Sequence, residues 1–276
     1  MAVTTAPILL PADPNPSTQR YGLFNAANGP LDLPVHARNG GLKYTTNICK
    51  LPGGYAVNCT PGGVAKTFTD GLTTVTGNPF VVIAETLCGS AGYTEQEWNA
   101  MAFQKLQAGE QAAVELIFSG GTVGVAPSLA NNTPNVTALT AVTSVPAAIG
   151  SLEAALYATY GPTGILHIPV ADAAYVLIDG YVYLDGRVWR TKNGTAVSFG
   201  NYANLKPDGT APAAGHSIWY VTGQMTIWRT PDSEVFISPW DRSINTTTNQ
   251  LKMYAEREYV VAYDCFAASV DVTPGA

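Results

Sequence analysis

The chain has 276 residues, of which 46% are hydrophobic and 12% are charged, and its net charge is −6. This hydrophobic content excludes a disordered chain, and the lack of a basic stripe argues against specific binding of nucleic acid. In soluble domains about a quarter of the residues are usually charged. Because the charged share of this chain is much lower, we expect neighbouring subunits to cover much of its surface.

The first 79 residues predict two extended segments. Residues 1–40 contain six prolines and almost no periodic pattern, which indicates an N-terminal arm. Residues 41–79 alternate short β-prone runs with glycine pairs, which is typical of a long two-stranded loop. The first residues lack the pattern of a signal peptide, and no apolar run reaches the roughly 20 residues of a membrane span. We therefore expect synthesis in the cytoplasm and no membrane contact.

A short apolar strand at 80–84 leads into a long helix. Thr94 and Glu97 form a capping box at its start, and Gly120 and Gly121 end it. Its apolar stripe is expected to comprise Trp98, Ala102, Leu106, Gly109, Ala113 and Leu116. At about 1.5 Å per residue this helix is roughly 36 Å long, which is too long for a simple connector.

The second half of the chain predicts a compact mixed region. Pro146 to Tyr160 forms a second helix, which Gly161 stops. A buried strand at 165–168 and a short helix at 170–178 follow. Hairpins are expected at the Asp-Gly pair of 185–186 and the Asn-Gly pair of 193–194. The last element, 251–272, alternates well enough to be one long strand.

Few residues offer chemistry. The three histidines, His36, His167 and His216, are far apart and are expected to be structural. Four cysteines, Cys49, Cys59, Cys88 and Cys265, are too scattered for a disulfide scaffold. Free thiols are favoured, and a bridge between Cys49 and Cys59 remains open.

The densest charge group is Glu256, Arg257 and Glu258 in the last strand. Alternation places Arg257 on the face opposite the two acids, so it cannot pair with either. We expect Arg257 to meet an acid on a neighbouring strand or subunit.

This order of elements resembles that of the major capsid proteins of tailed bacteriophages, whose Hong Kong 97 type fold is shared with encapsulins. Three stretches carry the likeness: TEQEWNAMAFQKLQAGEQAAVELIFSGG, SLEAALYATYGPTGILHIPVADAAYV and LKMYAEREYVVAYDCFAASVDVT. The resemblance implies an α+β fold with an N-terminal arm (1–40) and an extended β-loop (41–79). A peripheral domain (80–144 and 236–276) would hold the spine helix, at about 94–118, and the apical domain would span 145–235.

The resemblance further implies self-assembly into the hexamers and pentamers of an icosahedral phage head, where the chain would reside in the virion around double-stranded DNA. It implies no enzyme activity, cofactor or metal, and only non-specific proximity to DNA. Decoration, scaffold or portal proteins are the expected partners besides further copies. Subunit contacts are expected at Arg20, Tyr21, Phe24, Lys43, Tyr44, Lys66, Phe68, Glu256, Arg257 and Glu258. Some relatives crosslink a loop lysine, but nothing around Lys43, Lys50 or Lys66 marks such a site, and none is predicted.

Two other functions fit parts of the sequence. A tail, decoration or connector protein would share the low charge and the β-rich pattern, although a tail-tube barrel would not need the long helix. A glycan hydrolase would pair Asp172 or Asp179 with Asp185 across a cleft. Its sugar-binding surface would use Trp189, Trp219, Trp228 and Trp240.

Overall fold

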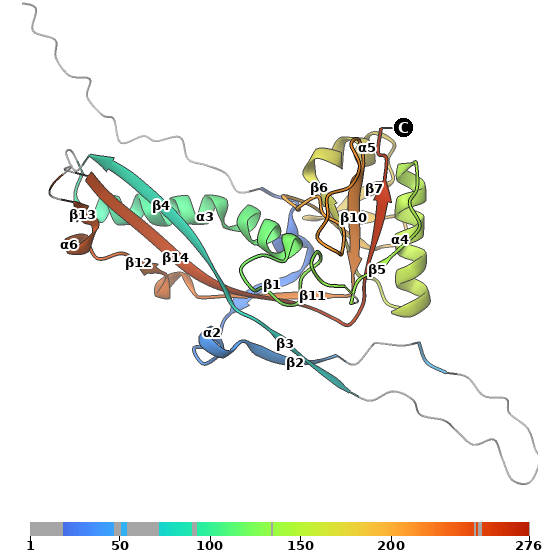
Figure 1. Ribbon diagram of the computed structural model, residues 1–276, viewed down its shortest axis with the longest axis horizontal. Coiled ribbons are helices and arrows are strands. Elements are labelled where there is room, and N and C mark those ends of the chain that lie inside the picture. Colours follow the sequence, from blue (N-terminus) through green and yellow to red (C-terminus); the bar gives the residue numbers. More distant parts are fainter. Residues whose placement is uncertain are drawn as a thin grey trace, which may run out of the picture.

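The chain forms an elongated body joined to a compact body at one end (Figure 1). The structure, a computed structural model, describes residues 19–46, 51–53, 72–89, 93–133, 135–245, 247 and 250–275. A six-stranded sheet and the long helix build the elongated body, and a seven-stranded sheet builds the compact one. The α+β class predicted from the sequence is confirmed.

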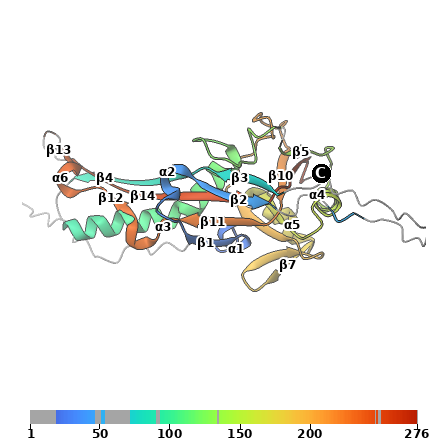
Figure 2. The ribbon, with the colours of Figure 1, turned by 90° about the horizontal axis from the view of Figure 1, so that it is seen from below.

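The elongated body is a sheet with the long helix α3 (Glu95–Gly120) along one face. Its central pair is β4 (Phe80–Gly89) and β14 (Gln250–Tyr263), which run antiparallel with Phe80 opposite Tyr259. Figure 2 shows this sheet nearly edge-on, with α3 on one side. The remaining strands are β1 (Asn28–Asp32), β11 (Met225–Arg229), β12 (Phe236–Ile237) and β13 (Ile244–Asn245).

The start and end of α3 are those that the sequence predicts. The Thr94 hydroxyl accepts the backbone N–H of Glu97, and the Glu97 carboxylate accepts the backbone N–H of Thr94 at 2.7 Å. The hydrogen bonds that the backbone N–H and the hydroxyl of Thr94 donate to the carboxylate hold the pKa of Glu97 below its ordinary value. Gly121 closes the helix in the left-handed conformation, with φ at 64°.

Replacing Thr94 with Ala is expected to lower the free energy of unfolding by about 1 kcal/mol, because the first turn of α3 loses its cap. Urea unfolding at neutral pH measures the change. Thr94→Ser is the matched control, since it keeps the hydroxyl oxygen and should cost much less. Equal losses in the two variants would contradict a capping role.

The buried stripe of α3 differs from the prediction in its second half. Trp98, Ala102 and Leu106 are buried as expected, but Gly109 and Leu116 are exposed and Ala113 is only partly buried. The buried positions continue at Glu110, Val114, Glu115 and Phe118. The prediction was wrong here because it assigned only apolar residues to the buried face, whereas the carboxylates of Glu110 and Glu115 are buried there with polar partners.

The compact body is a mixed sheet ordered β5-β15-β10-β6-β9-β8-β7, covered by the predicted second helix, α4 (Val145–Thr159). Helix α4 packs against β10 and β15. The strands are β5 (Thr137–Ala138), β6 (Ile165–Pro169), β7 (Val182–Asp185), β8 (Val188–Thr191), β9 (Ala196–Gly200), β10 (Ser217–Thr222) and β15 (Ala267–Val272). Short helical elements are η1 (Val170–Asp172), α5 (Ala173–Ile178), η2 (Asp232–Glu234) and α6 (Trp240–Ser243).

The predicted last strand is in fact two strands in different sheets. β14 ends at Tyr263, and β15 begins at Ala267 in the compact body, where it pairs with β10. Similarly, β11 belongs to the elongated sheet although it follows β10 directly. The boundaries expected at residues 144 and 236 therefore do not coincide with the division between the sheets, because alternation along a strand does not reveal which sheet it joins.

Part of the predicted arm packs on its own subunit. Residues 19–40 form α1 (Leu23–Ala26), β1 and α2 (Ala37–Gly40), and β1 pairs in parallel with β11. Leu23 and Leu33 are fully buried. An extended arm is therefore wrong for residues 19–40, which place Leu23 and Leu33 in the core, and the earlier part of the arm lies outside the described residues.

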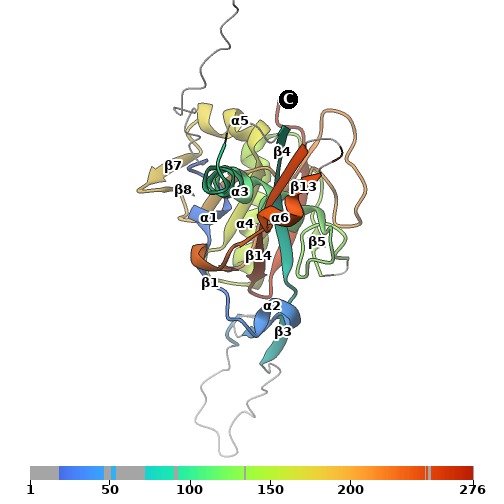
Figure 3. The same cartoon turned by 90° about the vertical axis from the view of Figure 1, so that its left-hand side faces the viewer.

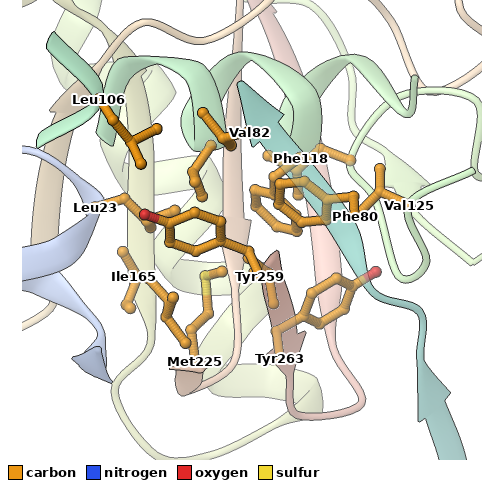
Figure 4. Packing of buried hydrophobic residues seen from close by; sticks show 14 of the residues in the cluster. Leu23, Phe80, Val82, Leu106, Phe118, Val125, Ile165, Met225, Tyr259 and Tyr263 are labelled. Atoms are coloured by element: carbon orange, nitrogen blue, oxygen red, sulfur yellow. The ribbon is translucent and has the colours of Figure 1, made fainter. Parts of the chain in front are cut away.

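One core joins the two bodies. Figure 4 shows Phe118 of α3 beside Phe80 of β4, with Tyr259 and Tyr263 of β14 close by. Phe118 makes edge contacts with the rings of Tyr263 and of His167 in the compact sheet. Because α3 contributes to both sheets' packing, the two bodies are held together by side chains and not only by the connecting chain.

Cys265, in the turn between β14 and β15, is disulfide-bonded. The expectation of free thiols is therefore wrong for this residue. Cys49 and Cys59 lie outside the described residues.

Candidate subunit interface

The base of the predicted loop is a two-stranded hairpin that projects from the elongated body (Figure 3). β2 (Leu42–Thr46) pairs antiparallel with β3 (Thr73–Gly77). The Tyr44 hydroxyl donates to the backbone oxygen of Tyr263 at 3.0 Å, and burial raises the pKa of Tyr44 above its ordinary value. Lys43 is exposed on β2. Lys50, Lys66 and Phe68 lie outside the described residues.

Three of the expected interface residues, Arg20, Tyr21 and Phe24, lie where residues 19–27 cross from one body to the other. The Tyr21 ring meets that of Trp189 edge to face at 5.7 Å, and Phe24 stacks on Tyr259 at 6.2 Å. Arg20 is exposed beside a hollow of about 450 Å³ that Arg187 also lines. Tyr21 and Phe24 thus have partners within the subunit, and Arg20 is the one of the three that is open to a neighbour.

The face of the elongated sheet opposite α3 carries exposed apolar side chains. On β4, Val81, Ile83 and Leu87 are 48%, 50% and 61% exposed. On the neighbouring strand β14, Tyr254 lies opposite Glu85, and its ring meets the exposed ring of Phe236 on β12 in a tilted arrangement at 5.9 Å. We call these five apolar and aromatic residues, together with the acid Glu256 between them, the open face.

Glu256 and Glu258 lie on this side of the sheet, as the alternation predicts, but their surroundings differ. Glu256 is partly exposed on the open face, next to Ile83 in the pairing register. Glu258 lies where α2 covers the sheet, and its carboxylate is 3.5 Å from Arg38. Only Glu256 therefore remains a clear candidate for contact with a neighbour.

Arg257 is an internal residue and not an interface residue, which corrects the expectation. It is 1% exposed and points toward α3, where its Nη1 lies 2.5 Å from Oε2 of Glu110. Its Nη2 lies 2.5 Å from Asp232. We expected the acidic partner of Arg257 on a neighbouring strand or on another subunit, because the sequence pattern did not show that Glu110 is buried on the helix.

Glu110 is the centre of a buried ionic cluster that fastens α3 to the sheet. Its Oε1 accepts from Arg229 at 2.5 Å, and its Oε2 accepts from Arg257 and from the Tyr259 hydroxyl, each at 2.5 Å. Burial and the adjacent Glu110 raise the pKa of Tyr259, so this hydroxyl stays protonated and donates. The cluster fastens β11 and β14 to α3, and β4, which carries part of the open face, is paired to β14.

The compact body exposes a second group of apolar side chains, along η1, α5 and β7. Ile178 is 83% exposed at the end of α5. The others in this stretch are Val170, Tyr175, Leu177, Tyr183 and Leu184. Sequence analysis missed these residues and those of β4. The signal that could have revealed the residues of β4 was the continuous apolar run Phe80 to Ala84. Such a run is typical of a strand covered on both faces, and within the subunit only one face of β4 is covered.

Two of the candidate catalytic carboxylates, Asp172 and Asp185, have structural partners of their own. The Asp172 carboxylate accepts the indole N–H of buried Trp219 at 2.8 Å, and Asp185 pairs with Arg190 at 2.9 Å. His167 is fully buried between Tyr202 and Thr222, and burial lowers its pKa to about 3, as fits a structural role. Among the described residues, no three His, Cys, Asp or Glu side chains gather as a metal site would require.

No helix in the described part of the chain has both the length and the apolar character needed to cross a bilayer.

Solved structures similar to this chain include capsids of phage-like particles. The capsid of the native GTA particle matches with a TM-score of 0.61 at 12% identity, covering 98% of this chain and 95% of that one. The capsid of the empty GTA particle matches with a TM-score of 0.58 at 14% identity, covering 97% and 95%. A chain of Mycobacterium phage Adephagia matches with a TM-score of 0.55 at 14% identity, covering 93% and 91%. The chain therefore has the Hong Kong 97 type capsid fold.

No protein-family model and no curated protein matches the sequence. The likeness to the solved structures thus lies in the fold, at 12% to 14% identity.

Proposed function

We propose that this chain is a major capsid protein, whose copies assemble as hexamers and pentamers into the icosahedral head of a tailed phage. The observation that carries the proposal is the match with capsid subunits over nearly the full length of both chains. A match of this extent includes the hairpin and the N-terminal segment as well as the central bodies. The chain would reside in the virion and enclose double-stranded DNA.

The surface of the subunit supports this function. The open face and the exposed stretch of 170–184 leave large apolar side chains in water, which is typical of protein contact sites. The hairpin β2–β3 projects from the elongated body, and Lys43 on β2 is exposed to a neighbour. Many such contacts, each modest, can stabilise a closed particle because symmetry repeats them.

We assign the parts of the subunit accordingly. The elongated body with spine helix α3 is the peripheral domain, the compact body is the apical domain, and the hairpin is the base of the extended loop. Of the interface residues predicted from the sequence, Arg20, Lys43 and Glu256 face outward. We assign subunit contacts to Arg20, to Lys43 and to the open face, which includes Glu256. Scaffold, portal and decoration proteins would be partners of the assembled shell.

Electron microscopy of the purified full-length chain tests the proposal. Closed shells with fivefold and sixfold clusters are the expected particles, because the subunit exposes contact surfaces on both bodies. Open rings or tubes would instead support a connector or tail protein. A chain that stays monomeric at high concentration and cleaves a polysaccharide would be an enzyme, and the capsid proposal would be abandoned.

A further inference from the structure

Cys265 forms a disulfide at the place where the chain crosses between the two bodies. The residue lies in the turn that leaves β14 of the elongated sheet and enters β15 of the compact sheet. It is disulfide-bonded and partly exposed. The sequence contains three other cysteines, Cys49, Cys59 and Cys88, so the bonded partner within the chain is one of these.

Strand geometry excludes Cys88 as the partner. Cys88 pairs with Leu251 near the start of β14, whereas Cys265 follows Tyr263 at the end of that strand. β14 has 14 residues, so at about 3.3 Å per residue its two ends lie roughly 40 Å apart. The Cα atoms of a disulfide are usually less than about 7 Å apart. The partner is therefore one of the two cysteines that follow β2 and precede β3 in the sequence.

The base of the hairpin leads toward Cys265. The Tyr44 hydroxyl donates to the backbone oxygen of Tyr263 at 3.0 Å, two residues before the cysteine. Thr46, the last residue of β2, lines a hollow of about 370 Å³ together with Cys265. Cys49 follows Thr46 by three positions, so the chain between them can span at most about 11 Å.

The chain is described again at residues 51–53, and Leu51 lies beside the same turn. A Cβ atom on Gly161 would lie 2.7 Å from Cδ2 of Leu51, so the two residues are in contact. Next to Gly161, the Tyr160 hydroxyl donates to the carboxylate of Asp264 at 3.0 Å. Asp264 is the residue directly before the disulfide-bonded cysteine. Leu51 therefore lies near this turn as well.

We propose that Cys265 is bonded to Cys49, and that this bridge fastens the base of the loop between β2 and β3 to the crossing between the two bodies. Cys49 itself lies outside the described residues, but Thr46 and Leu51, which flank it in the sequence, both lie near the crossing. Cys59 is eight positions beyond Leu51 and has no such constraint on both sides. The bridge forms within one subunit and does not require shell formation.

The bridge forms by thiol–disulfide exchange with a small-molecule disulfide, such as glutathione disulfide, as the oxidant. The thiolate of Cys265, which is partly exposed, attacks one sulfur of the oxidant and expels one glutathione thiolate. The thiolate of Cys49 then attacks the sulfur of Cys265 in this mixed disulfide and expels the second. The two cysteines lose two electrons to the oxidant, and their two protons pass through water to the glutathione thiolates. A reducing cytosol would keep both thiols free.

Peptide mapping of the full-length chain tests the pairing, because trypsin places each cysteine on a separate peptide. Cleavage after Lys and Arg yields 44–50 with Cys49, 51–66 with Cys59, 67–105 with Cys88 and 258–276 with Cys265. The chain is oxidised with glutathione disulfide, its free thiols are blocked with iodoacetamide, and the digest is analysed by mass spectrometry without reduction. The expected product is 44–50 linked to 258–276, with the other two cysteines alkylated.

Several results of this mapping would overturn the proposal. One is a link from 258–276 to 51–66 or to 67–105. Another is a Cys265 that is alkylated or that carries glutathione. A third is a bond to a second copy of the chain, which a dimer on a non-reducing gel would reveal.

Hydrogen exchange tests whether the bridge fastens the hairpin. Reduction of the oxidised chain with dithiothreitol should lower the protection factors of the β2 and β3 amides by about tenfold or more, because the base of the loop loses its covalent attachment. The amide of Val260, in the elongated sheet, is the internal reference and should change far less. Equal protection in the oxidised and reduced chain would contradict the fastening role, and this comparison needs no variant.

Two serine variants separate the two loop cysteines. Cys49→Ser should show the low protection of the reduced chain under both conditions. Cys59→Ser is the matched control, since it makes the same change in the same loop, and it should behave as the unmodified chain. The opposite assignment of the two variants would show that Cys59 is the partner. None of these results would bear on whether the chain forms shells.

Discussion

Replacement of Glu110 by Gln is expected to lower the free energy of unfolding by about 3 to 5 kcal/mol, because it removes the negative charge from the centre of a buried cluster. Arg257, whose side chain is 0% exposed, would then be a buried cation with Asp232 as its one remaining acid in the described part of the chain. Arg229 would lose its 2.5 Å contact as well. Urea unfolding of the full-length chain at neutral pH measures the effect.

The matched control is Glu95→Gln, because the same change on the exposed surface of α3 breaks none of the described ion pairs and should cost well under 1 kcal/mol. A double variant, Glu110→Leu with Arg257→Leu, separates loss of charge from loss of packing. It should be more stable than Glu110→Gln, because it leaves no buried arginine without its partner. Equal stability of the single variant and its control would show that the cluster contributes nothing.

Ile83→Glu on the open face should reduce the yield of closed shells by at least about tenfold while the subunit stays folded. Ile83 is half exposed in the subunit, so the change costs little there. In a shell the same position would be covered, and an unpaired charge would be buried next to Glu256, which adds repulsion. Each 1.4 kcal/mol lost at a contact lowers its association constant tenfold.

Sedimentation and electron microscopy measure the shell yield, and thermal unfolding checks the subunit. Ile83→Val is the matched control, because it keeps an apolar β-branched side chain, and it should assemble normally. Normal shells from Ile83→Glu would show that the open face faces solvent in the particle.

The features predicted correctly from the sequence are those that depend on neighbouring residues. The capping box of Thr94 and Glu97, the left-handed Gly121 and the helix after Pro146 each involve groups within a few positions of one another. Their hydrogen bonds form wherever the helix forms. The resemblance to a capsid subunit depended on the order of such elements, and the structural matches bear out the fold.

The errors lie where distant residues decide the environment. Glu110 was not assigned to the buried face of α3 because its partners, Arg229 and Arg257, follow more than a hundred positions later. Glu115 was missed because its partners are backbone N–H groups, which no sequence pattern reveals. Arg257 was placed at an interface because its position in a strand was recognised but its acidic partner, Glu110, was not.

The amino-acid order alone thus specifies the long helix, the hairpin turns and the overall succession of elements, since these arise from short-range hydrogen bonds and periodic burial. Only the folded chain decides that β14 and β15 join different sheets, that residues 19–40 pack on their own subunit, and that Glu110 and Glu115 are buried. The reason is physical: the cost of burying a charge depends on what surrounds it, and those surroundings come from parts of the chain that meet only on folding.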